Sequence, residues 1–220
     1  MTISVIAGSS QGIGLELVRQ LAARGETVVA VCRGEMPEVP GDVRVETGLD
    51  FTTEGVMERL AARLTGLEVG LLVVNAGLLV PDTFDTFDVA QLRAQLEINA
   101  IAPLLLVRAL RPNLKRGSKV ALVTSRMGSM ADNTSAGYYG YRMSKAALNM
   151  AGTCLAVDLK PAGIAVGLLH PGYVRTRMVG WHGEIDVGQA ALGIIGHIDR
   201  LDLTNTGGFW HASKAMRLPF

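Results

Sequence analysis

An excess of charge of either sign is absent from this sequence. Its 220 residues include 21 Lys and Arg against 20 Asp and Glu, so the net charge is +1, and the charges form no basic or acidic block. A chain without a basic patch offers no electrostatic reason to bind nucleic acid or an anionic membrane surface. We therefore expect neither as a partner.

Paired cysteines and long apolar runs are also missing. Cys32 and Cys154 have neither the spacing of a disulfide scaffold nor that of a zinc site, and we expect no catalytic metal. The best candidate for a membrane span, Ala100–Leu114, is too short and is interrupted by Pro103 and two arginines. The N-terminus lacks the cationic start and the cleavage site of a signal peptide. These absences predict a cytoplasmic protein in a reducing environment.

Short apolar runs alternate with longer amphipathic stretches along the chain. Hydrophobic residues make up 49% of it and charged residues 19%, which favours a single packed domain over residues 1–220. Runs rich in Val, Ile and Leu predict strands over Ile3–Ala7, Thr27–Cys32, Val43–Glu46, Leu71–Val74, Lys119–Thr124, Ala165–Leu169 and Gly207–Ala212. Helical periodicity predicts helices over Ile13–Arg24, Glu54–Leu64, Val89–Asn113, Tyr141–Lys160 and Asp186–Ile198.

This succession predicts the α/β class, as a single Rossmann-like, doubly wound parallel sheet flanked by helices on both faces. Ligands of such sheets bind beyond the carboxyl ends of the strands, where the strand order reverses. The motifs described next all follow predicted strands, so we expect them to meet at one edge of the sheet.

A glycine-rich turn follows the first predicted strand. It consists of Gly8, Ser9, Ser10, Gln11, Gly12, Ile13 and Gly14. The spacing is G-x-x-x-G-x-G rather than the G-x-G-x-x-G of the general dinucleotide fingerprint. Glycines allow a tight turn whose backbone N–H groups face a phosphate, and the following helix N-terminus adds positive potential. An ordinary strand-to-helix turn is the alternative, and the position in the first βαβ unit favours a nucleotide site.

The glycine spacing resembles that of the short-chain dehydrogenase/reductase family, and the resemblance covers nearly the whole chain. Asn75, Ala76 and Gly77, after the fourth strand, resemble the second glycine motif of the family, which shapes the cofactor site. The resemblance implies a nicotinamide cofactor and a small-molecule carbonyl or alcohol substrate. Within the family, the chain most resembles the small carbonyl reductases and C-factor-like proteins.

The end of the second strand bears on the choice of cofactor. An acid there hydrogen-bonds the ribose 2′-hydroxyl of NAD, whereas an arginine accommodates the 2′-phosphate of NADP. The strand ends in Arg33, which favours NADP(H) over NAD(H) through a charge-assisted contact. Glu35 keeps NAD(H) open, and a solvated surface arginine is the alternative for Arg33. Asp50 resembles the adenine-contacting acid of the family, although a helix N-cap or turn residue is equally compatible with it.

Tyr141 and Lys145 stand four residues apart and therefore share a helix face. A tyrosine has an ordinary pKa of about 10, and a neighbouring positive charge lowers it. Such a phenol can exchange a proton with a substrate oxygen while hydride moves to or from the nicotinamide. The pattern Y-x-x-x-K occurs by chance on many helices. Its combination with Ser125 and the glycine-rich turn is what predicts a catalytic site.

Ser125 and Asn99 complete the catalytic set by resemblance to the family. Ser125 would hydrogen-bond the substrate carbonyl beside Tyr141, with Thr124 and Ser129 as rivals. Asn99, inside the long central helix, would support a water-mediated proton relay with Lys145. A helix bend or a satisfied polar contact is the alternative for Asn99, since Asn is a mediocre helix former.

The segment after the sixth strand resembles the Pro-Gly segment of the family. Its residues Pro171, Gly172, Val174 and Thr176 would meet the nicotinamide end of the cofactor, and a turn without ligand contact is the alternative. His170 is expected to be structural. The region around residues 172–198 is predicted to be a short substrate lid.

Apolar residues cover more than one face of the helix after Tyr141. They are Met143, Ala147, Leu148, Met150, Ala151, Cys154, Leu155 and Val157. A helix on a sheet needs only one apolar stripe, so we expect a homodimer or homotetramer that uses this helix.

The leading functional hypothesis is an NADP(H)-dependent aldehyde or ketone reductase. The alternative is an NADP-binding regulatory or signalling protein with weak turnover, and the intact set of Ser125, Tyr141 and Lys145 argues for the enzyme.

Overall fold

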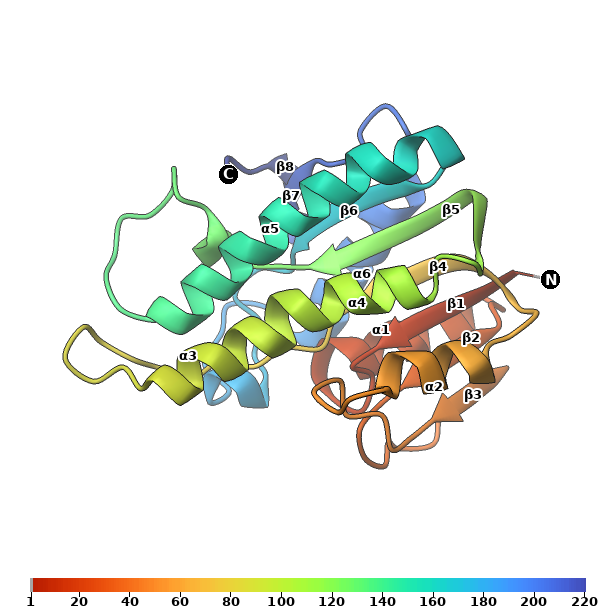
Figure 1. The fold of residues 1–220 in the computed structure, drawn as a ribbon, viewed down its shortest axis with the longest axis horizontal. Helices are drawn as coiled ribbons and strands as arrows, with labels where there is room; N and C mark the ends of the chain where they lie inside the picture. The colour runs from red at the N-terminus through yellow and green to blue at the C-terminus, as the bar shows by residue number, and fades with distance from the viewer. Residues whose placement is uncertain (1) are drawn as a thin grey trace.

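In the computed structural model, which describes residues 2–220, eight strands form one sheet in the order β3-β2-β1-β4-β5-β6-β7-β8 (Figure 1). The strands are Thr2–Ala7 (β1), Val28–Val31 (β2), Val43–Glu46 (β3), Glu68–Val74 (β4), Leu114–Val123 (β5), Ala165–His170 (β6), Phe209–His211 (β7) and Met216–Arg217 (β8). Every neighbouring pair is parallel except β7 with β8. The order reverses between β1 and β4, which confirms the predicted doubly wound sheet.

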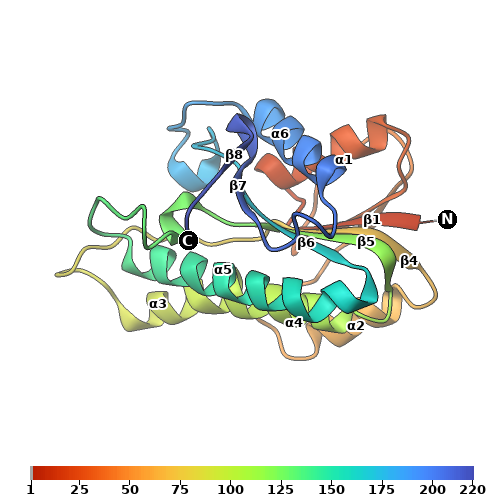
Figure 2. The ribbon, with the colours of Figure 1, turned by 90° about the horizontal axis from the view of Figure 1, so that it is seen from above.

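Helices cover both faces of the sheet. They are Gly12–Ala23 (α1), Val56–Arg63 (α2), Val89–Leu96 (α3), Ala102–Ala109 (α4), Tyr139–Leu159 (α5) and Val187–Arg200 (α6). Figure 2 shows α1 and α6 on one face and α2, α4 and α5 on the other, with α3 continuing the line of α4 toward the loops. Among residues 2–220, no helix combines the length and apolar character needed to cross a bilayer.

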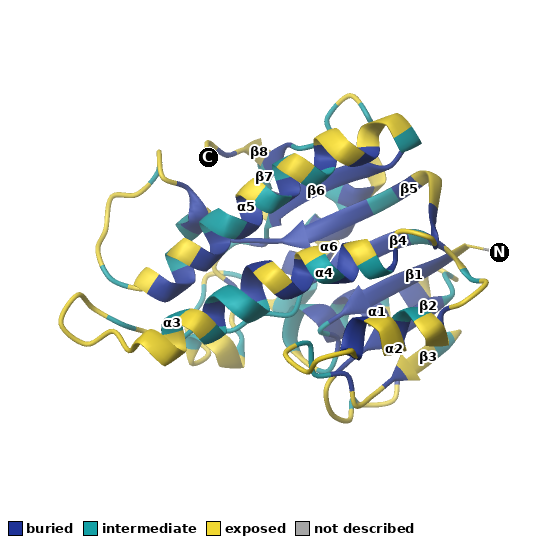
Figure 3. Cartoon of the chain, in the orientation of Figure 1, coloured by how far each residue is buried: buried dark blue, intermediate teal, exposed yellow. Residues whose placement is uncertain are grey.

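The two faces of the sheet hold separate apolar cores, because successive side chains of a strand point in opposite directions. On β1, Val5 and Ala7 face the core under α2, α4 and α5, whereas Ile6 faces the core under α1 and α6. The central strands are buried on both faces, and the helices that cover the sheet turn their buried residues toward them (Figure 3). This two-sided burial is why the strands read as nearly continuous apolar runs in the sequence.

The predicted helix over Val89–Asn113 is wrong as one continuous element. It is divided into α3, a π-helical turn over Glu97–Ile101, and α4. The physical cause is Pro103, which has no N–H to donate to the carbonyl of Asn99 four residues earlier. Single π turns inside helices occur often at functional sites. The helix also ends at Ala109, earlier than expected, because Pro112 cannot extend it.

Strand boundaries shift at two central strands, and the sheet has one further edge strand. β4 begins at Glu68 and β5 at Leu114, both earlier than predicted, because Val69 and Leu114 pair before the register shifts. The two-residue β8 covers the edge of β7 and is too short to show a periodic pattern.

Residues 187–198 of the predicted lid region belong to α6, which packs on α1. Only residues 172–186 therefore remain free to serve as a lid.

Candidate active site

The two glycine motifs contact each other at the carboxyl ends of β1 and β4. Asn75 donates its side-chain N–H to the Gly8 carbonyl at 3.0 Å, and the Ala76 amide donates to the Ala7 carbonyl at 3.0 Å. Gly8 has a φ of +86°, and a Cβ on it would lie 2.5 Å from the Ala76 nitrogen. A Cβ on Gly14 would collide with the Gly8 carbonyl. Both glycines are therefore required by close backbone packing.

Gly12 has a different environment, which fits a phosphate. It opens α1 with a φ of +57°, and a Cβ built on it would meet only the Thr176 methyl group, at 3.6 Å. The N-cap residue Gln11 makes no side-chain cap, and the first turn of α1 holds no acidic residue. The first N–H groups of a helix need partners, and a phosphate supplies them where the side chains do not. The cradle between Gly12 and Thr176 thus fits the pyrophosphate of a dinucleotide.

Arg33 lies at the carboxyl end of β2 with 81% of its side chain exposed, and its guanidinium is 3.8 Å from the Asp50 carboxylate. Asp50 accepts hydrogen bonds from the Thr52 amide at 3.0 Å and the Thr52 hydroxyl at 2.7 Å. These bonds, with a smaller contribution from Arg33, hold the pKa of Asp50 below its usual range. Asp50 is therefore a turn residue and not the N-cap of α2, which is Gly55. Its contact with adenine stays a prediction.

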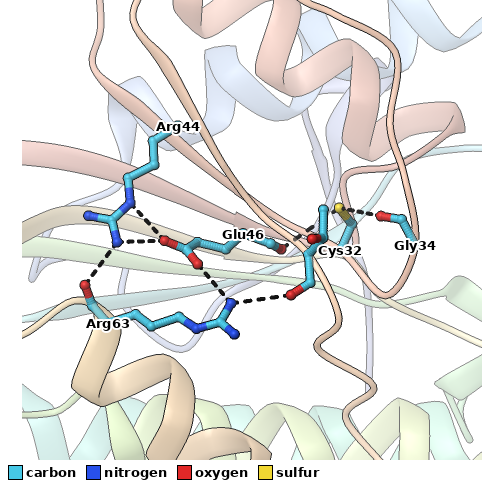
Figure 4. A network of polar contacts seen from close by, with 6 residues as sticks. Cys32, Gly34, Arg44, Glu46 and Arg63 are labelled. Atoms are coloured by element: carbon cyan, nitrogen blue, oxygen red, sulfur yellow. Dashed lines mark hydrogen bonds and ion pairs between the residues drawn. The ribbon is translucent and has the colours of Figure 1, made fainter.

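A network of polar contacts joins the end of β3 to Cys32 and Gly34, which precede and follow Arg33 in the chain (Figure 4). The Glu46 carboxylate, at the end of β3, accepts from Arg44 at 2.7 Å and from Arg63 at 2.9 Å. The Cys32 thiol donates to the Gly34 carbonyl at 3.0 Å. Because Arg44 and Arg63 already occupy the Glu46 carboxylate, Arg33 pairs only loosely, with Asp50.

The predicted catalytic residues Ser125, Tyr141 and Lys145 lie together where β5 ends against the first turns of α5. All three are buried, with exposed fractions of 7, 8 and 4%. The Lys145 ammonium is 5.8 Å from the centre of the Tyr141 ring and donates to the Val123 carbonyl at 3.0 Å. The Ser125 oxygen accepts from the Met127 amide at 3.1 Å, which fixes the short 3₁₀ turn over Arg126–Gly128.

Burial dominates the titration of both ionisable groups. It raises the pKa of Tyr141 to about 12, although a hydrogen bond with Ser125 opposes the rise. It lowers the pKa of Lys145 to about 8. The expectation of a depressed pKa for Tyr141 is therefore not met in this structure, because burial of the phenol outweighs the effects that lower its pKa. At neutral pH Tyr141 is a phenol that can donate a proton.

Asn99 is fully buried in the π-helical turn, and its side chain is completely engaged. Its amide N–H groups donate to the Leu78 carbonyl at 2.7 Å and the Ser144 hydroxyl at 2.9 Å, and its oxygen accepts from the Leu78 amide at 2.7 Å. Both alternatives, a distorted helix and a satisfied polar contact, therefore hold. A relay to Lys145 would have to use the backbone carbonyl of Asn99, and it stays a prediction.

The segment after β6 closes the site from the side of the glycine-rich turn. The Pro171 carbonyl accepts from the Ser213 hydroxyl at 2.5 Å, Gly172 has a φ of +102°, and Val174 is buried. Thr176 reaches the Gly12 cradle, as described above. Beyond it, a Cβ on Gly77 would lie 3.6 Å from the Met178 methyl group, so the short lid crosses the second glycine motif.

His170, which is partly exposed, packs edge to face on the buried His211, with ring centroids 4.7 Å apart. Burial, with repulsion from His211 and nearby cations, lowers the pKa of His170 to about 3. His170 is thus neutral at pH 7, and its structural role stays a prediction. No group of three metal-ligating side chains occurs among residues 2–220.

Sequence reasoning missed several residues that support the site. Asn149 accepts from the Thr124 hydroxyl at 2.7 Å and donates to the Gly128 carbonyl at 3.3 Å, which ties the turn after Ser125 to α5. Its position four residues after Lys145, on the same helix face, was a signal that could have found it. Thr124, the rival of Ser125, is occupied by this contact. Asp82 was also missed, since it lies in a loop without periodicity.

Comparison with known proteins agrees with this geometry. The sequence profile of the family described as short chain dehydrogenase matches residues 2–184. A 1-hydroxy-2-glutathionyl-2-methyl-3-butene dehydrogenase of Rhodococcus sp. (strain AD45) is 41% identical over 219 residues, which cover 96% of this chain and 97% of that protein. The C-signal protein of Myxococcus xanthus is 40% identical over 157 residues, which cover 70% of this chain and 95% of that one.

A solved structure extends the similarity to three dimensions. The NADPH-bound carbonyl reductase from chicken fatty liver superposes with a TM-score of 0.88 and 26% identity, with both chains fully covered. The profile match spans most of the described residues and includes the glycine motifs, Ser125, Tyr141 and Lys145. The chain therefore belongs to the short chain dehydrogenase family of oxidoreductases.

Proposed function

We propose that this protein transfers hydride between NADP(H) and a small carbonyl or alcohol substrate, with aldehydes and ketones as the leading class. The observation that carries the proposal is the burial of Ser125, Tyr141 and Lys145 in one cluster at the carboxyl edge of the sheet. When bound, the nicotinamide supplies or accepts the hydride. The protein's own residues orient the substrate oxygen and move its proton.

Each catalytic side chain has a distinct task in this proposal. The Ser125 hydroxyl donates to the substrate oxygen and holds it beside Tyr141. The Tyr141 phenol, protonated at neutral pH, gives its proton to the developing alkoxide during reduction. Lys145, with a pKa of about 8, still carries mostly a positive charge at neutral pH, and this charge stabilises the phenolate that Tyr141 leaves behind. Their burial excludes water and strengthens these interactions.

The cofactor is held by groups along the same edge. The N-terminus of α1 at Gly12 receives the pyrophosphate, and Thr176 closes the cradle from the opposite side. Arg33 contacts the ribose 2′-phosphate, for which its exposed guanidinium, only loosely paired with Asp50, is accessible. Asp50 contacts the adenine. The NADPH bound to the similar chicken carbonyl reductase supports the choice of NADP(H).

Residues 1–220 act in this proposal as one NADP(H)-binding domain in the cytoplasm, with residues 172–186 as the lid. The active unit is a homodimer or homotetramer formed through α5. Met143, Met150 and Val157 lie on the face of α5 turned away from the sheet and are 49, 63 and 72% exposed. A second copy of the helix would remove these side chains from water.

The decisive experiment mixes the purified protein with NADPH and a panel of aldehydes, ketones and quinones. The reverse reaction, with NADP⁺, includes alcohols and the 1-hydroxy-2-glutathionyl alkene of the Rhodococcus relative. We expect turnover that the Tyr141→Phe variant loses by about 10²- to 10⁴-fold, while its affinity for NADPH stays within twofold. Failure of the wild-type protein to bind NADPH would refute the cofactor assignment and the reaction together.

A regulatory or signalling protein is the second candidate, favoured by the similarity to the Myxococcus C-signal. A protein of this class would bind NADPH through the Gly12 cradle but would not need Ser125. Binding of NADPH without turnover on the whole panel, in both directions, would favour this candidate over the enzyme.

A further inference from the structure

The helix that carries Tyr141 and Lys145 does not cap its own N-terminus. Its N-cap residue is Tyr138, which has a left-handed backbone with φ of +54° and makes no side-chain cap. The first N–H groups of a helix require acceptors, and a helix end without them frays. Tyr141 is the third residue of α5, so fraying of the first turn would displace the proposed proton donor itself.

Asp82, far away in sequence, supplies the missing acceptors. Its two carboxylate oxygens accept from the Tyr139 amide at 2.5 Å and from the Gly140 amide at 3.2 Å. Its backbone carbonyl accepts from the Tyr138 amide at 2.9 Å. Three consecutive amides at the start of α5 are therefore held by one residue. A Cβ on Gly137 would lie 3.0 Å from the Asp82 carbonyl, so the loop and the helix start approach closely.

The loop that carries Asp82 is held by hydrogen bonds to the helix segment that contains Asn99. Asn99 binds both the amide and the carbonyl of Leu78, and the Gln95 oxygen accepts from the Val80 amide at 3.0 Å. Asn99 and Gln95 are fully buried. Asn99 also donates to Ser144 of α5. Hydrogen bonds thus hold the loop to the helix segment over residues 95–99, and they hold the start of α5 to the loop. The bond between Asn99 and Ser144 then connects α5 back to the π-helical turn.

We propose that Asp82 is a positioning residue for Tyr141, an inference that rests on the proposed function. By holding the amides of Tyr139 and Gly140, its carboxylate fixes the first turn of α5 and keeps the Tyr141 hydroxyl beside Ser125. Displacement of a reacting group by about 1 Å can cost a factor of about 10² in rate. The electrostatic attraction of a carboxylate to a helix N-terminus favours the same arrangement.

Three variants test the proposal. Asp82→Ala removes the two carboxylate acceptors and keeps the backbone carbonyl, and Asp82→Asn keeps one side-chain oxygen that can accept from an amide. Asp202→Ala is the matched control, because Asp202 also accepts from two amides, those of Thr204 at 2.7 Å and Asn205 at 3.2 Å. That turn lies at the opposite end of the strands, next to the start of β6.

Two readouts separate positioning from stability. The first is kcat, with KM for the carbonyl substrate and Kd for NADPH. The second needs neither substrate nor cofactor: the ¹³Cζ resonance of Tyr141, which can be assigned with Tyr141→Phe because the chain has four tyrosines. We expect Asp82→Ala to lower kcat by about tenfold or more, with Kd for NADPH within twofold, and to shift or broaden the Tyr141 resonance. Asp82→Asn should restore part of kcat, and Asp202→Ala should change neither readout.

The proposal is overturned if Asp82→Ala keeps kcat within twofold of the wild type and leaves the Tyr141 resonance in place, whatever its Tm. If Asp82→Ala does not fold, the comparison uses Asp82→Asn, whose lost carboxylate oxygen should still lower kcat and move the resonance. If the wild-type protein binds NADPH without turnover, the proposed function fails, and the resonance alone decides whether Asp82 fixes Tyr141.

Discussion

Lys145 should make the protein less stable while it makes the site active. Its pKa falls from 10.5 to about 8 on burial, a difference of about 2.5 units, or between about 3 and 3.5 kcal/mol at roughly 1.4 kcal/mol per unit. The hydrogen bond to the Val123 carbonyl returns about 1 kcal/mol. Lys145→Met removes both, and its unbranched side chain fills the same space. We therefore expect the ligand-free variant to be more stable at pH 7 by about 2 kcal/mol.

The pH dependence gives this prediction its sign. Since the folded pKa of Lys145 lies below the unfolded one, the folded protein binds fewer protons between pH 8 and 10.5, and its stability rises with pH across that window. Below pH 8 the folded protein carries the full energetic cost of burying the charged Lys145 side chain. The advantage of Lys145→Met should therefore be largest at pH 7 and should shrink progressively as the pH approaches 10.5.

The assay is thermal unfolding of wild type and Lys145→Met, without cofactor, at pH 7 and at several values up to pH 10. At about 2–4 °C per kcal/mol for a chain of this size, Tm at pH 7 should rise by about 4–8 °C. Reductase activity should be lost in the same variant. A Tm equal to or below that of the wild type at pH 7, or a difference that does not change with pH, would refute the reasoning.

Three further predictions follow from the fold and the site. Arg33→Ser should weaken NADPH binding by about 10- to 100-fold and leave NADH binding unchanged in a fluorescence titration, because only NADPH carries the 2′-phosphate. Equal losses of affinity for both cofactors would contradict the assignment of Arg33 to the 2′-phosphate. Gly8→Ala should lower the free energy of unfolding, measured by urea denaturation, by more than about 2 kcal/mol, since its Cβ would meet the Ala76 backbone. The control Gly25→Ala has a similar φ but nothing within 4 Å of its Cβ, so it should lower that free energy by only about 1 kcal/mol, through backbone strain. Met150→Asp should turn the proposed homo-oligomer into a monomer by light scattering without unfolding it. A wild-type protein that is monomeric at micromolar concentration would contradict the proposed interface on α5.

Much of the fold was predictable because its signals are local. Val-, Ile- and Leu-rich runs such as Ala165–Leu169 predicted parallel strands, and their alternation with amphipathic stretches predicted helices on both faces. Gly8, Gly12 and Gly14 predicted the turn, and the spacing of Tyr141 and Lys145 placed both on one helix face. These patterns depend on backbone geometry within a few residues, which the sequence records directly.

Other features depended on contacts between distant segments. The break in the central helix required both Pro103 and the partners of Asn99, and only the folded chain shows that Leu78 and Ser144 are those partners. The boundaries of β4 and β5 followed from the early pairing of Val69 with Leu114. β8 exists only because the chain turns back along β7.

By itself, the sequence determined the class of the protein, and it predicted the edge of the sheet that holds the proposed site and the residue types proposed to act there. The tertiary structure alone decided their electrostatic state and support. Burial, which no motif encodes, raises the pKa of Tyr141 and lowers that of Lys145. Asp82 caps the helix of Tyr141 from a loop 57 residues earlier, because a hydrogen bond depends on distance in space and not on distance along the chain.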